Sequence, residues 1–558
     1  MFALRPTLLA AALASLAVGT PVAQAAAGGS AVSSTQAAAI AKALPLVRSL
    51  ERTHPRAFSQ VSRPVAGEWQ IAFYSRNQEF VAVLVSTADG RVIATYTGIQ
   101  IAWTMARGLP GAFGHHVTAL YIWLPLCLLF LAPFFDWRRP LAPRNFDLLA
   151  LTSLSISLAF FNHAAINDSV PLAYPPLLYL VARLAWLARP RAPRPPPLRL
   201  NFGPRLLAVA LVALVAFRVS LNVADSGVID VGYANVVGAQ KVLHAQPIYG
   251  QFPGSIARGD TYGPVSYEAY APFVAAFGFS GRWDSLPAAH AAAIAFDLLT
   301  IALLFALGWR IRGPSTGVVL AYAWAAFPFT AFALECNSND ALVAALVTAA
   351  LLAASSPPAR GFLAALAGLT KYAPLALAPV LATYRLGSSR ARGLGAFAIA
   401  FALAAALALF PALDHNTLPT IFSRSITYQA DRAAPFSIWG LYGGLGAVQF
   451  AVQALAVAFA LALAIQRRDD PISLAAAAAA ILIAVQLGVT YWFYLYIPWF
   501  FAPAAVAFLG GARLESRPRR DSKLGGGLVV WDGTRGAWLL DRPKSVLFGG
   551  RARGSSGL

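Results

Sequence analysis

The sequence predicts an all-α polytopic membrane protein with a small α+β domain near its N-terminus. Three observations lead to this fold class. The 558 residues are 58% hydrophobic and 12% charged, with a mean hydropathy of +0.61, whereas soluble domains carry about 25% charged residues. Apolar runs of about 18–20 residues, each long enough to cross a bilayer as a helix, recur along the chain. Basic residues gather between those runs. Together these features exclude a soluble protein and a disordered one.

The basic residues indicate a membrane topology rather than nucleic-acid binding. The chain has 43 basic and 23 acidic residues, a net charge of +20, and such an excess is also the footprint of nucleic-acid-binding proteins. The arginines, however, lie in short clusters between the apolar runs, at residues 138–144, 189–205, 310–312, 385–392, 467–468 and from 513 onward. This is the positive-inside pattern. We therefore expect a lipid bilayer, and no nucleic acid, as the partner of this charge.

The N-terminus has the pattern of a signal peptide. Arg5 forms a short positive region, residues 8–18 are apolar, and Ala23-Gln24-Ala25 fits a cleavage site. We predict a signal peptide over residues 1–25, with an uncleaved signal anchor as the alternative. In both cases the following stretch, residues 26–115, is extracytoplasmic.

This stretch predicts a small α+β domain. Residues 34–53 have helical apolar spacing, while residues 68–74, 79–86 and 91–96 alternate like strands. The order of a helix and a hairpin, ending in DGRVIATYTG, resembles a PepSY-type propeptide domain. The resemblance implies an interaction or regulatory role for residues 26–115 and no catalysis.

The rest of the chain is predicted as two membrane segments and a tail. Residues 116–188 form a three-helix membrane segment, and the Pro/Arg-rich residues 189–204 form a cytoplasmic linker. Residues 205–512 form a larger membrane module, and residues 513–558 a basic cytoplasmic tail. The eleven predicted spans are residues 117–135, 146–163, 171–188, 205–222, 287–308, 314–333, 340–355, 394–413, 446–465, 472–490 and 493–510.

Two apolar segments of the larger module do not fit a simple span. Residues 361–384 are interrupted at Lys371 and Pro374, which predicts two half-helices running up and back. Residues 264–280 contain Glu268 and two prolines, and counting them as a span would place Arg310 and Arg312 outside. They are therefore predicted as an interfacial or re-entrant helix. With these segments the total is about 11–13 membrane helices.

Acidic residues of the membrane module collect on the predicted outer face. Asp260, Asp284 and Asp414 are expected in solvated loops. Asp225 and Asp230 instead follow a span directly, and Asp230 heads a predicted helix. A carboxylate in a cleft at the end of a span suits a general base, because burial raises its pKa toward the working pH. The alternative is that Asp230 only caps its helix.

Three basic residues are candidates for binding an anion. Lys371 interrupts the apolar run LAALAGLTKYAPLALAP, and a cation within membrane-embedded sequence is costly and usually functional. A lipid phosphate is its natural partner. The alternative is an anchor whose ammonium reaches the headgroups. Arg424 and Arg432 lie in a predicted outer loop and break the positive-inside pattern, which favours phosphate binding.

Two further clusters lie between or before spans. The stretch ECNSND ends in Asn337, Asn339 and Asp340, whose side chains suit sugar hydroxyls. Asp340 is equally suited to be a helix N-cap. The aromatic residues Tyr491, Trp492, Tyr494, Tyr496 and Trp499 are expected to form an interfacial belt rather than a sugar-stacking surface. No Walker A or H-E-x-x-H motif supports ATP-driven transport or zinc proteolysis.

The order of these features from about residue 205 to 510 resembles the GT-C superfamily of polyprenyl-phosphate-sugar-dependent glycosyltransferases, and its glycosyltransferase 87 (DUF2029-like) group in particular. Three stretches carry the resemblance: IDVGYANVVGAQKVLHAQPIYG with TYGPVSYEAYAPF, then NSNDALVAALVTAALLA, then GFLAALAGLTKYAPLALAPVLATYR. The family's first-loop Asp falls on Asp230 and its Lys on Lys371, while Asn339 and Asp340 fall on a polar position after a core span. Gly263-Pro264 stands where the family usually has Pro-Pro.

The resemblance implies an inverting transferase with its active site at the outer face of the cell membrane. It would move a hexose or pentose, mannose-like, from a polyprenyl-phosphate donor to a cell-envelope glycan or lipid acceptor. We expect Asp230 as the catalytic base and Lys371, Arg424 and Arg432 at the donor phosphate. The expected substrate-binding residues are Asp225, Tyr233, Tyr262, Asn337, Asn339 and Asp340. Some superfamily members use a divalent cation, but no ligand set here demands one.

Two other functions fit part of the same pattern. A transporter or flippase of lipid-linked sugars would share the outer-face site, and an inactive membrane scaffold would need only the outer domain. A transporter places titratable residues at mid-membrane and often has internal repeats. The sequence has one acid within a predicted span, Asp297, and no detectable repeat, which favours the enzyme.

Overall fold

The computed structural model describes residues 32–511, except 64–66, 77, 103–104, 106–113, 191–196, 284 and 387–388, together with residues 529–532 and 537–540. The chain divides into two compact units, Met1–Arg513 and Leu514–Leu558. In the second, strands β5 (Val529–Asp532) and β6 (Ala537–Leu540) pair antiparallel. The predicted signal peptide, most of the predicted tail and the centre of the predicted linker lie outside the described residues.

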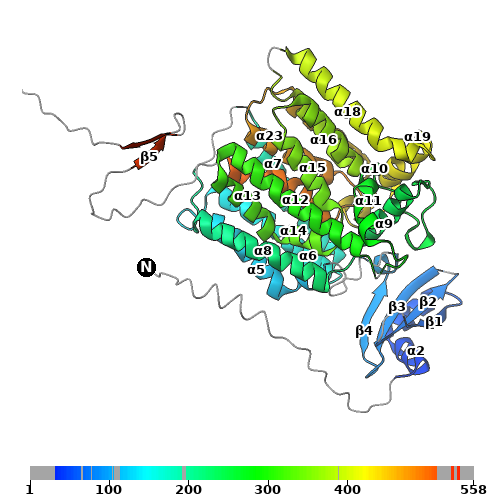
Figure 1. Cartoon of the computed structure of the whole chain (residues 1–558). Helices are drawn as coiled ribbons and strands as arrows, with labels where there is room; N and C mark the ends of the chain where they lie inside the picture. Colours follow the sequence, from blue (N-terminus) through cyan, green and yellow to red (C-terminus); the bar gives the residue numbers. More distant parts are fainter. Residues whose placement is uncertain are drawn as a thin grey trace, which may run out of the picture. The chain divides into compact units, whose positions relative to one another are not determined.

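The N-terminal domain is one antiparallel sheet with two helices (Figure 1). The chain order is α2 (Ser34–Ala43), α3 (Pro45–Thr53), β1 (Phe58–Ser62), β2 (Glu68–Ser75), β3 (Gln78–Ser86) and β4 (Val92–Thr97), and the strands pair in sequence order. A capping box between Ser33 and Gln36 starts α2. Inward residues of β2 and β3, such as Phe73 and Val83, pack with Ala37 of α2. The predicted helix and three strands are present, and β1 is an additional strand.

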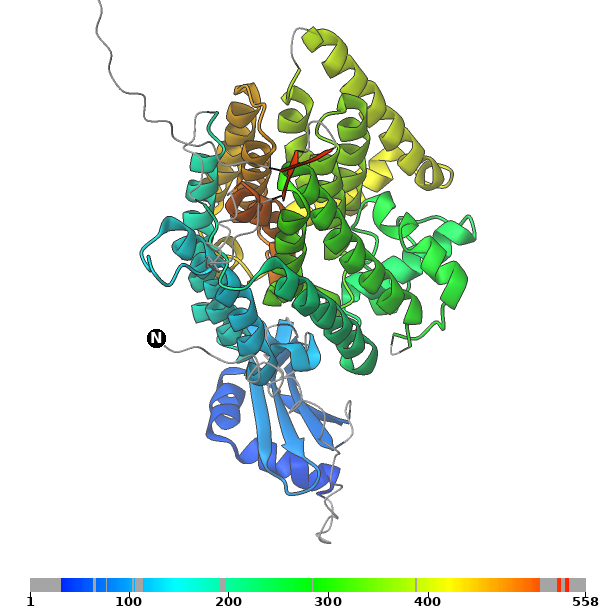
Figure 2. The same ribbon diagram turned by 60° about the vertical axis from the view of Figure 1, so that its left-hand side comes forward.

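The second part of this unit is a bundle of apolar helices (Figures 1 and 2). Every predicted span coincides with a helix. Six helices are long and apolar enough to cross a membrane, or seven if the bent pair α13–α14 counts as one span, among the described residues. The remaining predicted spans coincide with shorter apolar helices. The helices are α5 (Leu120–Phe134), α6 (Pro143–Asn162), α7 (Ile166–Leu187), α8 (Pro204–Asp225), α12 (Pro287–Arg312), α13 (Pro314–Ala326), α14 (Pro328–Glu335), α15 (Asp340–Leu352), α16 (Pro357–Thr370), α18 (Arg390–Leu413), α22 (Gly446–Ile465), α23 (Pro471–Leu487) and α24 (Ile497–Ala505).

Shorter helices join these elements on the side that carries the acidic loops. They include α9 (Asp230–Leu243), α10 (Pro264–Glu268) and α11 (Ala271–Phe277). Helices α10 and α11 occupy the segment predicted as interfacial, and each is too short to span a bilayer. The 59° bend between α13 and α14 falls at Pro328, because proline cannot donate the backbone hydrogen bond that a continuous helix needs.

The predicted pair of half-helices around Lys371 is confirmed. Helix α16 ends at Thr370, and the chain continues through a 3-10 turn, Ala373–Leu377, into α17 (Ala378–Thr383). Arg360, in the first turn of α16, donates to the backbone carbonyl of Tyr384, which follows α17 (2.9 Å). The segment therefore runs up and returns to the same end, with Lys371 at its turning point.

The basic connections predicted to share one membrane side do meet at one end of the helices. Arg310 donates to the carbonyl of Leu352 (2.6 Å). The amide of Arg385 donates to the carbonyl of Arg468 (3.3 Å), and the Arg468 guanidinium donates to the carbonyl of Ala188 (3.0 Å). The connections that follow α7, α17 and α22 are therefore held together, and the ends of α12 and α15 are joined to each other, while Lys371 lies at the other end of α16.

Candidate active site

Two glycines allow close backbone packing at the end of α16 and at the start of α9. A Cβ at Gly263 would lie 1.9 Å from the carbonyl oxygen of Leu369, at the end of α16. A Cβ at Gly232, in the first turn of α9, would lie 2.3 Å from the carbonyl oxygen of Asn337. Both contacts are closer than any side chain permits. Gly263, which departs from the family's usual proline, thus lets Tyr262 approach Lys371.

Lys371 forms a buried ion pair with Asp340. Its ammonium lies 2.6 Å from Oδ1 of Asp340, and the two side chains are 8% and 0% exposed. The same oxygen accepts a hydrogen bond from the indole of Trp499 (2.8 Å). The structure thus excludes the alternative in which Lys371 anchors to lipid headgroups. It also excludes Asp340 as an N-cap, because Asn339 occupies the cap position and no side chain caps α15.

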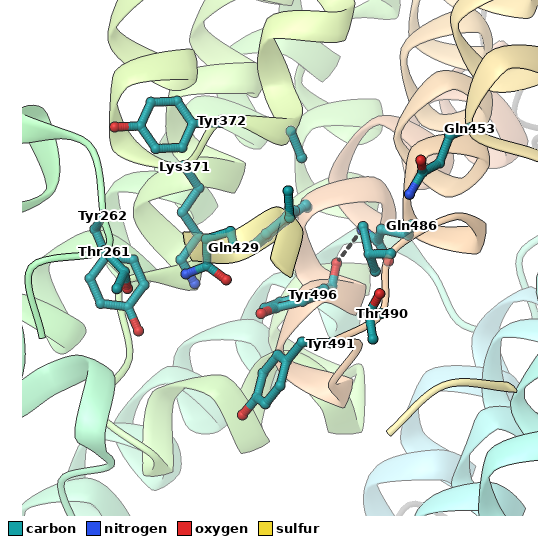
Figure 3. Close-up of a pocket in the computed structure, with 14 residues that line it drawn as sticks. Thr261, Tyr262, Lys371, Tyr372, Gln429, Gln453, Gln486, Thr490, Tyr491 and Tyr496 are labelled. Carbon is teal, nitrogen blue, oxygen red and sulfur yellow. Dashed lines mark hydrogen bonds between the residues drawn. The ribbon is translucent and has the colours of Figure 1, made fainter. Parts of the chain in front are cut away.

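Lys371 lines a cavity of about 270 Å³. The rings of Tyr262, Tyr496 and Trp499 surround its ammonium at 5.6, 5.2 and 5.0 Å from the ring centroids. Figure 3 shows Tyr262 and Thr261 beside Lys371 and Gln429, with Gln453, Gln486 and Thr490 at the opposite end of the cavity. The remaining lining residues are Tyr372, Ala373, Ala430, Val489 and Tyr491. Among the described residues, Lys371 is the only charged side chain of this lining.

The prediction of an interfacial aromatic belt is wrong. Trp492, Tyr494 and Trp499 are buried within the bundle, and Tyr491, Tyr496 and Trp499 line the cavity. These rings give the cavity a cation-binding and sugar-stacking character. The dense aromatic run is typical of a membrane interface, so composition alone could not distinguish a belt from a cavity wall.

Asp230 lies beside this cavity without lining it. Burial raises the pKa of Asp230 above its usual value, while the nearby charges of Arg432 and Lys371 lower it and that of Asp340 raises it. Asp230 is the first residue of α9, and its Oδ1 accepts from the amide of Val231 (2.8 Å). The charges of Lys371, Arg432 and Asp340 therefore act on Asp230, while the prediction that Asp230 and Lys371 face one cleft stays a prediction.

The two outer-loop arginines have different surroundings. Arg432 lies over the ring of Tyr491, 3.9 Å from its centroid, and so belongs to the cluster. Arg424 is paired with Asp260 at 2.7 Å and does not line the cavity. Asp260 also accepts from the amide of Gly250 (2.6 Å) and is only 1% exposed. The expectation that Asp260 is solvated is therefore wrong, because Arg424 compensates its buried charge.

Four predicted substrate-binding residues have other partners. Asp225 accepts from the His116 ring (2.5 Å), and Tyr233 stacks on Trp283. Asn337 accepts from Asn222 (2.9 Å) and donates to Ser226 and to the carbonyl of Gly227 (2.9 Å each). Asn339 donates to Ser266. These contacts shape the loops around the site, and none of the four residues lines the cavity.

A second cavity of about 440 Å³ adjoins the first, and Tyr372 lines both. Its other walls are Leu369, Leu375, Leu409, Leu418, Pro419, Ile421, Phe422, Ser425 and Ile426. Apart from Tyr372 and Ser425 this lining is apolar. Residues of one short segment, 369–375, therefore line both a cavity that contains a cation and a cavity that is largely apolar.

Sequence reasoning missed the neutral polar part of the site. Gln453 and Gln486 lie within apolar runs, and Thr490 follows a helix. An amide inside an apolar run is itself a signal, since burying it without a partner costs free energy. Among the described residues, no group of three or more His, Cys, Asp or Glu side chains suits a metal ion.

Residues 261–511 match the sequence model of glycosyltransferase family 87. The match covers the cavity walls named above and confirms the predicted family. This segment, somewhat less than half of the chain, is therefore similar to glycosyltransferase family 87. The resemblance of residues 26–115 to PepSY-type domains stays a prediction.

One solved structure with a significant match is ArnT from Cupriavidus metallidurans, bound to undecaprenyl phosphate. The TM-score is 0.39 at 14% identity, and the match covers 54% of this chain and 59% of ArnT. This chain thus spans less than two thirds of that protein. No curated protein matches the sequence significantly.

Proposed function

We propose that this protein transfers a hexose or pentose, mannose-like, from a polyprenyl-phosphate donor to a glycan or lipid acceptor of the cell envelope. The reaction takes place at the extracytoplasmic face of the plasma membrane. The match of residues 261–511 to glycosyltransferase family 87 supports the reaction class. The observation that supports the donor class is the position of Lys371 in the wall of one cavity, next to Tyr372, which also lines a second and largely apolar cavity.

A polyprenyl-phosphate sugar has three chemically distinct parts in a row: a sugar, an anionic phosphate and a hydrocarbon chain. The larger apolar cavity suits the first isoprene units of the chain, and the polar cavity suits the sugar. Lys371 belongs to the segment 369–375, whose residues line both cavities. In the proposed binding mode, the phosphate of the donor lies at its ammonium. Its pairing with Asp340 fixes the ammonium before the donor arrives, so no reorganisation is needed on binding.

In the proposed reaction an acceptor hydroxyl attacks the anomeric carbon from the face opposite the phosphate. A carbon–oxygen bond forms to the acceptor as the bond to the phosphate oxygen breaks, which inverts the configuration. Asp230 accepts the proton of the attacking hydroxyl, and the phosphate leaves with the bonding electron pair. The burial that raises the pKa of Asp230 makes it a stronger base than an exposed aspartate.

Charge accumulates on the departing phosphate oxygen as this bond breaks. Lys371 offsets it directly, and Arg432, held over the Tyr491 ring, adds a second positive charge. Preorganised charges of this kind usually supply the largest part of a rate enhancement. Arg424 is paired with Asp260 and does not line the cavity, so it is a weaker candidate for this role.

The transporter alternative has less support. The acid within a predicted span, Asp297, lies 2.5 Å from Arg218, and both side chains are almost fully enclosed. An acid neutralised in this way is not poised to exchange protons or ions. A scaffold, in turn, gives no reason for a buried cation beside a cavity.

The direct test is transfer of labelled sugar from polyprenyl-phosphate donors by the purified full chain in liposomes. Asp230→Asn is expected to lower turnover at least about a hundredfold, because it removes the base. Lys371→Met alone would leave Asp340 buried and unpaired, so the double variant Lys371→Met/Asp340→Asn is compared with Asp340→Asn. The lysine's loss is expected to lower turnover by about a thousandfold. Unchanged turnover in both Asp230→Asn and the double variant would reject these assignments.

A further inference from the structure

The end of the polar cavity away from Lys371 consists of neutral hydrogen-bonding groups. Gln453 from α22, Gln486 from α23 and Thr490 lie there together, as Figure 3 shows. The proposed mechanism gives none of them a role. Gln453 and Gln486 lie in otherwise apolar helices, and all three side chains line the cavity. This position suggests that they bind a polar ligand.

Two of these side chains have hydrogen-bonding capacity left over. The amide nitrogen of Gln453 donates to the carbonyl of Gly488 (2.9 Å). Within the described part of the chain no donor is recorded for its carbonyl oxygen. Thr490 Oγ1 accepts from the amide of Gln449 (2.8 Å), which leaves its own hydroxyl proton available. Gln486 differs, because it donates to the carbonyl of Tyr496 (3.0 Å) and accepts from the indole of Trp492 (3.1 Å).

We propose that Gln453 and Thr490 determine sugar specificity by binding a hydroxyl group of the transferred sugar. The inference rests on the proposed function and assigns to these residues the recognition of the donor's sugar. One acceptor (Gln453 Oε1) and one donor (the Thr490 hydroxyl) match a sugar hydroxyl, which both donates and accepts.

The charge of the lining defines the class of sugar further. Lys371 is the only charged residue among the described cavity walls, and it faces the phosphate in the proposed donor pose. A carboxylate or ammonium group on the sugar would therefore be buried beside Gln453 without an opposite charge, which is strongly unfavourable. The subsite accordingly favours a sugar that carries hydroxyl groups and no charge.

Gln449 provides a matched control. It lies one turn before Gln453 on α22, and its amide donates to the same carbonyl of Gly488 (3.0 Å), but it does not line the cavity. Gln449→Met and Gln453→Met thus both remove a hydrogen bond to the carbonyl of Gly488, and Gln449→Met also removes the hydrogen bond to Thr490 Oγ1. Only the second removes an atom that touches the proposed sugar. Thermal unfolding of each variant in detergent measures their effects on folding.

The experiment compares donors in the liposome transfer assay: polyprenyl phosphates bearing an unmodified hexose or pentose, its single-deoxy analogues, an amino sugar and a uronic acid. The wild type is expected to prefer the unmodified sugar and to discriminate against one deoxy analogue. Gln453→Met is expected to lower kcat/KM for the unmodified donor about 10–100-fold and to leave that deoxy donor little changed. Gln453→Glu is expected to shift preference toward the amino sugar about tenfold or more.

The outcomes separate this inference from the function on which it rests. If the wild type transfers no sugar from any donor, the proposed function fails, and the inference with it. If the wild type is active but both Gln453 variants keep its donor preference, the inference fails alone. A Gln453→Met variant that changes only the KM of the acceptor would also overturn it.

Discussion

Two buried ion pairs in this bundle use similar chemistry for different purposes. In both, one carboxylate oxygen accepts from a cation and from a tryptophan indole: Asp297 from Arg218 and Trp324, and Asp340 from Lys371 and Trp499. The Arg218 guanidinium is then taken up by further protein acceptors, the carbonyl of Ala325 and the hydroxyl of Thr330 (3.1 Å each). Arg218 is 1% exposed and lines neither cavity.

Among the described residues, no further protein acceptors of this kind bind the ammonium of Lys371. Its recorded hydrogen bond is to Asp340, and the rest of its surroundings are three aromatic rings and the cavity. Arginine presents a fork of five donors that a helix bundle can satisfy, whereas the compact lysine ammonium keeps donors for an incoming anion. The comparison teaches that a buried cation is a functional candidate when it borders a cavity that an anion can enter, as Lys371 does and Arg218 does not.

The largest effect that tests this contrast is expected at Arg218. Arg218→Met leaves Asp297 buried without its cation, which costs about 3–5 kcal/mol of stability. Thermal unfolding in detergent should show this loss, while turnover per folded molecule stays close to the wild-type value. If Arg218→Met folds normally but has lost turnover, Arg218 is functional and the distinction between the two ion pairs is wrong.

The next effect compares the two outer-loop arginines. Arg432→Met is expected to lower turnover about 10–100-fold by removing positive charge beside Asp230 and the phosphate. Arg424→Met instead leaves Asp260 buried and unpaired, so it should lower the unfolding temperature and spare kcat per folded molecule. Transfer rates and thermal unfolding measured together separate the two. If instead Arg424→Met lowers turnover and Arg432→Met lowers only the unfolding temperature, the donor phosphate lies near Arg424.

The smallest effect concerns Glu268, a carboxyl without a cation. Its Oε1 is buried with no hydrogen-bond partner among the described residues, and burial raises its pKa to about 7. The folded protein thus holds this proton more tightly than the unfolded chain, whose glutamate has an ordinary pKa of 4.5. Its contribution to stability is greatest below pH 4.5 and is lost as the pH rises to about 7.

Glu268→Gln is expected to remove that part of the pH dependence, about 1–3 kcal/mol. Unfolding temperatures of the two proteins should converge at low pH and differ most above neutrality, where the variant is more stable. Identical pH profiles would show that Glu268 is solvated or paired in the folded protein.

The fold was predictable to a large extent because its signals are local. Hydropathy located a helix at each predicted span, of which six or seven are long and apolar enough among the described residues to cross a membrane, and the interruption at Lys371 and Pro374 located the half-helices. The site was predictable only in part. Asp230 and Lys371 stood out because charge is rare in such sequence, but the pairing of Asp340 with Lys371 is a long-range contact that no local pattern encodes. Asp260 and the aromatic run were misjudged for the same reason, since their burial depends on segments distant in the chain.

The central claim is that the Lys371 ammonium binds the phosphate of a lipid-linked donor. The most direct measurement is the affinity of polyprenyl phosphate, without a sugar, for the purified full chain in detergent. The Lys371→Met/Asp340→Asn variant is expected to bind at least about tenfold more weakly than Asp340→Asn, whereas Arg424→Met keeps the wild-type affinity. Equal affinities of the double variant and Asp340→Asn would contradict the claim.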